Sequence, residues 1–100
     1  MSGTPAADLA ALDALRSQRR IFSGDYDAGA EFAFLARRCS RRYYRPAYIA
    51  AITVLERSGG RGAVEAVVIH GRLPAGMREF GRLADGLDAL HEHFKAEGIL

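Results

Sequence analysis

Apolar side chains recur along this chain at spacings of three and four residues. The clearest series lies in the last quarter and comprises Phe80, Leu83, Leu87, Leu90 and Phe94. This spacing gathers the five side chains on one side of a helix, as the seam of a helical bundle requires. The pattern predicts a helix over residues 75–97.

The same periodicity predicts four further helices, separated by segments rich in glycine, proline and aspartate. The predicted helices cover residues 5–21, 28–44, 46–57, 63–71 and 75–97. The fourth range contains a β-branched run that also suits a strand, but no partner strand is visible, so a short buried helix is expected. The sequence therefore predicts an all-α fold, a compact bundle of four to five helices that forms a single domain over residues 1–100.

Two finer expectations concern packing. The helix over 46–57 is apolar around much of its circumference and is expected to be the most buried element. Gly81 and Gly86 interrupt the last helix, at a cost of up to about 1 kcal/mol each relative to alanine. Such glycines permit the close approach of another helix, from this chain or from a partner. Self-association through the helix 75–97 is compatible with this pattern.

Composition adds an uneven charge distribution. The net charge is only +2, but residues 16–45 carry eight arginines against three carboxylates, whereas residues 46–100 carry six basic groups against seven acidic ones. The longest uncharged apolar run, residues 46–55, is half of the roughly 20 residues that a membrane-spanning helix needs. A single cysteine and a first segment without signal-peptide features favour a cytoplasmic protein.

Catalytic and metal-binding chemistry finds little support in the residue pattern. Cys39 falls on the predicted core stripe of the helix 28–44, where a buried thiol is the simplest interpretation; a reactive thiol would require neighbouring arginines to lower its pKa. His91 and His93 are two residues apart, so on a helix they point about 200° apart and cannot readily hold one ion. The glycine-rich segment 58–62 follows a helix, whereas phosphate-binding loops follow a strand. No catalytic residue, metal site or cofactor is predicted.

The stretch from Arg37 to Arg45 is the unusual feature of the chain, with five arginines and two tyrosines in nine residues. On a helix over 28–44, Cys39 and Tyr43 would join the core stripe. The arginines would form an outward surface shared with Phe34. Like charges four residues apart destabilise a helix by a few tenths of a kcal/mol per pair, so an anion that neutralises them is expected.

Three sources of that anion stay open at this point. One is the chain itself, through carboxylates of the last helix. The other two are nucleic acid, bound with weak sequence specificity through its phosphates, and the acidic surface of a protein partner. In the last case the chain would be a small regulator, inhibitor or assembly subunit. The candidate binding residues are Phe34, Arg37, Arg38, Arg41, Arg42, Tyr44 and Arg45.

Overall fold

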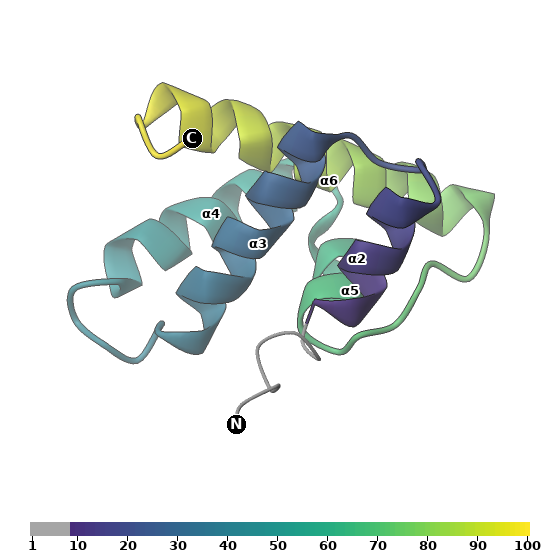
Figure 1. The fold of residues 1–100 in the computed structure, drawn as a ribbon. Helices are drawn as coiled ribbons and strands as arrows, with labels where there is room; N and C mark the ends of the chain where they lie inside the picture. The colour runs from purple at the N-terminus through teal and green to yellow at the C-terminus, as the bar shows by residue number, and fades with distance from the viewer. Residues whose placement is uncertain (1–8) are drawn as a thin grey trace.

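A computed structural model describes residues 9–100 and confirms the predicted fold class. The described chain is all-α, a compact bundle of five helices without strands (Figure 1). The helices are α2 (Ala10–Ser17), α3 (Ser23–Arg37), α4 (Arg45–Ser58), α5 (Arg61–Val68) and α6 (Met77–Ala96). The predicted start of the first helix at residue 5 lies outside the described residues. None of the helices within residues 9–100 is long and apolar enough to cross a membrane.

Helix α6 is the element on which the others pack. It lies along one side of the molecule and contacts α3, α4 and α5 (Figure 1). Four side chains of the predicted seam are completely buried: Leu83, Leu87, Leu90 and Phe94. The periodicity of the last quarter therefore identified the centre of the hydrophobic core, and this chain itself covers the seam.

Two glycines bring the α4–α5 turn into direct contact with α6. A Cβ atom on Gly86 would lie 2.7 Å from Cγ2 of Val64. A Cβ atom on Gly60, the residue before α5, would lie 2.5 Å from the carbonyl oxygen of Arg82. The predicted close approach at Gly86 is thus confirmed, whereas nothing lies within 4 Å of a Cβ atom on Gly81. Of the two glycines in α6, only Gly86 therefore has a packing role.

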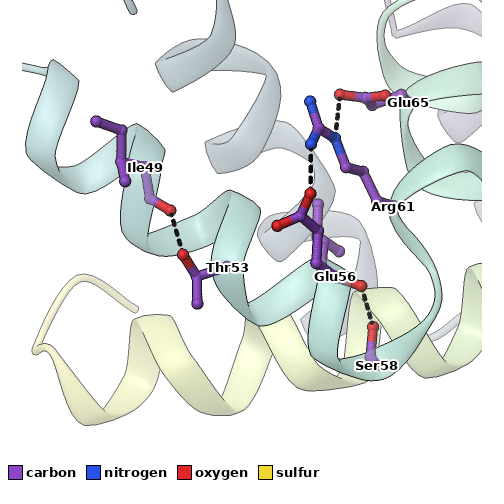
Figure 2. A network of polar contacts seen from close by, with 7 residues as sticks. Ile49, Thr53, Glu56, Ser58, Arg61 and Glu65 are labelled. Atoms are coloured by element: carbon purple, nitrogen blue, oxygen red, sulfur yellow. Dashed lines mark hydrogen bonds and ion pairs between the residues drawn. The ribbon is translucent and has the colours of Figure 1, made fainter.

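A cluster of polar contacts braces the same turn (Figure 2). Nη1 of Arg61 lies 2.7 Å from Oε2 of Glu56, and its Nε lies 3.2 Å from Oε2 of Glu65. The Ser58 hydroxyl donates a hydrogen bond to the Leu55 carbonyl at 2.9 Å. The bonds to Glu65 and Glu56 raise the pKa of Arg61. Arg61 is therefore neutralised within the fold, by carboxylates at the end of α4 and within α5.

Helix α3 begins earlier than predicted, at Ser23 rather than at residue 28. The turn-forming residues 23–27 make its first turn, because tertiary contacts hold them in helical geometry. The Tyr26 hydroxyl donates a hydrogen bond to Oδ1 of Asp13 at 2.6 Å, and the Arg16 guanidinium lies 4.1 Å from the centre of the Tyr26 ring. These contacts tie the start of α3 to α2.

Helix α3 also ends earlier than predicted, at Arg37 rather than at residue 44. In a continuous helix the carbonyls of Cys39 and Ser40 would accept hydrogen bonds from amides four residues later. Instead the Arg45 side chain donates to both carbonyls, from Nε at 3.4 Å and from Nη2 at 3.2 Å. The prediction that residues 38–44 are helical is therefore wrong. The repulsion between like charges in this stretch further disfavours a helix.

Three burial predictions are also wrong. Tyr43, expected in the core, is 85% exposed, and Cys39 is half-buried rather than part of the core. Helix α4 is not the most buried element, since only Ala51 and Leu55 are buried in it and Ile49 is 55% exposed. The exposed face of this helix includes Pro46, Ile49 and Thr53, whereas its alanines are buried or half-buried.

The start of α3 also predicts a pH dependence of stability. The pKa of Asp25 is raised, chiefly by burial, with the Phe22 N–H and His91 opposing the shift and Asp88 adding to it. Neutral Asp25 is therefore favoured in the folded state, so its contribution to the free energy of unfolding falls as the pH rises from its usual pKa of 3.8 through the raised value. We expect the free energy of unfolding of the native chain, minus that of Asp25→Asn, to fall as the pH rises above 3.8 and to level off once the pH exceeds the raised pKa of Asp25. Urea denaturation measures it, and a difference that grows with pH contradicts this account.

Candidate nucleic-acid interface

The predicted binding residues lie mainly in the loop that joins α3 to α4. We call this loop, together with the first residue of α4, the basic connector (residues 38–45). Figure 1 shows this loop at one end of the molecule, beyond the ends of both helices. Of the predicted arginines, only Arg37 lies within α3, and Arg45 is the first residue of α4. A folded loop thus replaces the helix face that was expected from the sequence.

Two arginines of the basic connector hold it in shape. The Arg38 guanidinium lies 3.9 Å from the centre of the Phe34 ring, and its Nη1 donates a hydrogen bond to the Phe34 carbonyl at 3.3 Å. Arg45 binds the two carbonyls described above, at the middle of the loop. These side chains act as internal cross-links, so their charge is presented in a fixed position.

Among the described residues, the side chains of the other two arginines of the basic connector form no hydrogen bond with the protein. Arg41 and Arg42 are exposed, and within residues 9–100 neither side chain forms an ion pair or a hydrogen bond. Pairing with carboxylates of α6, the internal alternative considered from the sequence, is therefore not formed by these two residues. Their charges face solvent beside each other.

Three aromatic rings contact one another in series, from Phe34 in α3 through Tyr44 to Tyr43, the last two residing at the end of the loop before α4. The rings of Phe34 and Tyr44 meet edge to face, with centres 5.4 Å apart, and those of Tyr44 and Tyr43 do the same at 4.9 Å. Tyr44 also packs against the hydrophobic core. Edge-to-face pairs are a favourable geometry for aromatic side chains. These contacts fix the position of the exposed Tyr43 ring, and Arg42 is the residue that precedes it in the sequence.

Tyr43 is an exposed aromatic residue that the list of candidate binding residues left out. Its position on the helical repeat assigned it to the core, and Tyr44 was named as a binding residue instead. In the structure Tyr43 is 85% exposed and Tyr44 packs against the core, because the chain leaves the helix at Arg37 and the periodicity no longer applies. The proline at position 46 and the density of like charges before it were the available signals of such a break.

The remaining chemical candidates have packing or surface positions. The His91 ring lies against Gly24, where a Cβ atom would be 3.0 Å from its Cε1. Among the described residues, no three histidine, cysteine, aspartate or glutamate side chains lie together as metal ligands would. What the basic connector offers a ligand is two guanidinium groups and one aromatic ring.

Comparisons of the chain with protein-family models, with curated proteins and with solved structures found no match in any of the three.

Proposed function

We propose that this protein binds single-stranded nucleic acid through its basic connector, with weak sequence specificity. Arg41 and Arg42 contact phosphates, and the Tyr43 ring stacks on an unpaired base. The observation that carries the proposal is the exposed Tyr43 ring, which follows two arginines that have no partner within residues 9–100.

The chemistry of the three side chains fits this ligand. Guanidinium groups form charge-assisted hydrogen bonds with phosphate oxygens, which fix the position of a strand without reading its sequence. An aromatic ring stacks on any base, since every base has a π-face. The bases of a duplex are already stacked on each other, so an exposed aromatic ring suits a single strand better.

The alternative, a protein-interaction module that meets an acidic surface, has weaker support. It relies on Phe34 as an apolar anchor beside the arginines. One face of the Phe34 ring is covered by the Arg38 guanidinium, and the ring also meets Tyr44. Phe34 is still 37% exposed, so these contacts leave part of its ring accessible but cover the rest. An acidic surface would use Arg41 and Arg42 but has no need of the Tyr43 ring.

Replacing Tyr43 by alanine tests the proposal. Stacking of one base on an aromatic side chain contributes about 1–3 kcal/mol, so affinity for a labelled 12-nucleotide single strand should fall by about 5- to 150-fold. Fluorescence anisotropy at 50 mM salt measures the affinity for RNA and for DNA. Tyr43→Phe, which keeps the ring, should bind within about twofold of the native chain.

The fold should not change in either variant, because the Tyr43 side chain is 85% exposed. Equal affinity of Tyr43→Ala and the native chain would contradict base stacking. A native chain that binds no oligonucleotide, but retains a stoichiometric acidic protein after nuclease treatment, would support the protein-interaction module instead.

A further inference from the structure

A groove of about 900 Å³ lies between α5 and the first turns of α6. The loop that connects the two helices closes its remaining side. In Figure 1 this region is found around α5, the loop after it and the start of α6. Small residues line its α5 side: Gly59, Gly62, Ala63 and Ala66.

The margin of the groove carries apolar side chains in solvent. Met77, the first residue of α6, is 92% exposed, and Leu73 in the preceding loop is 47% exposed. Both line the groove. Small residues on one side allow a partner backbone to come close, and a flexible methionine adapts to the apolar side chains of a partner. The surface is therefore suited to a peptide with an apolar stripe.

The rim of the groove is positively charged. Arg72, Arg78 and Arg82 line it and are exposed, and in the described part of the chain none of their side chains forms an ion pair. The one carboxylate of the lining, Glu79, accepts a hydrogen bond from the Ala75 N–H at 2.7 Å. Three arginines thus surround an apolar floor with one carboxylate that is already engaged.

We propose that this groove binds an acidic amphipathic helix of a partner protein. The apolar stripe of such a helix fills the floor, and its flanking carboxylates meet the three arginines, as in other helix-in-groove complexes. A helix with side chains is about 10 Å across and rises about 5.4 Å per turn. Two turns would thus fill roughly 850 Å³, which is close to the groove volume. The lining has no aromatic ring on which a base could stack, so a single strand fits this groove poorly.

Selection from a display library of random 16-residue peptides tests the proposal. Peptides are selected on the native chain alone, so that their affinity for the variants remains an independent test. We expect enriched sequences to carry apolar residues at i, i+3, i+4 and i+7 with aspartate or glutamate between them. A synthetic, labelled version of an enriched peptide is then titrated by anisotropy.

Arg78→Glu with Arg82→Glu should weaken binding of that peptide at least tenfold, and so should Ala66→Trp, which occupies the floor. Arg41→Glu with Arg42→Glu, which makes the same charge change in the basic connector, should alter it less than twofold. Both arginines of the groove variant are exposed, so its circular dichroism should match that of the native chain. The proposal is overturned if no peptide is enriched, or if the enriched peptides lack acidic residues or helical periodicity. It is also overturned if Ala66→Trp and the variant with Arg78→Glu and Arg82→Glu both bind the peptide as tightly as the native chain does. Because oligonucleotide binding is measured separately on the basic connector, either proposal can fail alone.

Discussion

Gly60→Ala is expected to destabilise the fold by about 3 kcal/mol, at the upper end of the usual range for overpacking. The new Cβ atom would lie 2.5 Å from the Arg82 carbonyl oxygen and 2.7 Å from the Gly86 Cα. Both are backbone atoms, which cannot rotate away as a side chain would. The start of α5 and the middle of α6 would have to separate, which disturbs the packing between them. Thermal unfolding should show the midpoint lowered by about 12–24 °C for a domain of this size.

Gly81→Ala is the matched control, since Gly81 lies in α6 but has open space around it. Alanine favours a helix interior by up to about 1 kcal/mol relative to glycine, so this variant should be slightly more stable than the native chain. A Gly60→Ala variant as stable as the native chain would contradict the close contact between the α4–α5 turn and α6.

Arg41→Glu with Arg42→Glu is expected to weaken single-strand binding by roughly 60-fold at 50 mM salt. Each phosphate contact with a single strand changes the slope of log K against log salt by about 0.7, and two contacts are lost. Neither side chain has a partner within residues 9–100, so the variant should fold as the native chain does. Arg78→Glu with Arg82→Glu makes the same change in net charge at the groove and should bind the oligonucleotide with nearly native affinity.

The helices that could be predicted from the sequence are those whose periodicity reports burial directly. The seam from Leu83 to Phe94 is buried as expected, and the β-branched residues Val64, Val67 and Val68 lie on a short buried helix. In these segments the same side chains define the repeat and fill the core. Their spacing was therefore sufficient to predict both the helix and its buried face.

The basic connector could not be predicted in the same way. The helical repeat continues through Cys39 and Tyr43, but hydrogen bonds from the Arg45 side chain take the carbonyls that a helix would use. Spacing of apolar residues carries no information about such a side-chain bond. The arginine content of the stretch correctly predicted a charged surface. The periodicity could not predict that this surface is a loop rather than a helix face.

The groove was hidden from the sequence for a different reason. Residues 46–100 carry nearly balanced charges, so their sum gave no sign of a basic site. At the α4–α5 turn, Glu56 and Glu65 form ion pairs with Arg61. They therefore do not neutralise Arg72, Arg78 and Arg82, which give the groove its positive charge. Self-association through α6 stays a prediction; because its seam is buried within the chain, a dimer would have to use the outer face of this helix.

The salt dependence of single-strand binding tests the central claim most directly, because it counts the phosphate contacts that the protein makes. Affinity for a labelled 12-nucleotide strand is measured between about 50 and 200 mM salt for the native chain and both double variants. Loss of the contacts of Arg41 and Arg42 should make the slope of log K against log salt less steep by about 1.4, while the groove variant keeps the native slope. An unchanged slope in Arg41→Glu with Arg42→Glu would contradict phosphate binding by the basic connector.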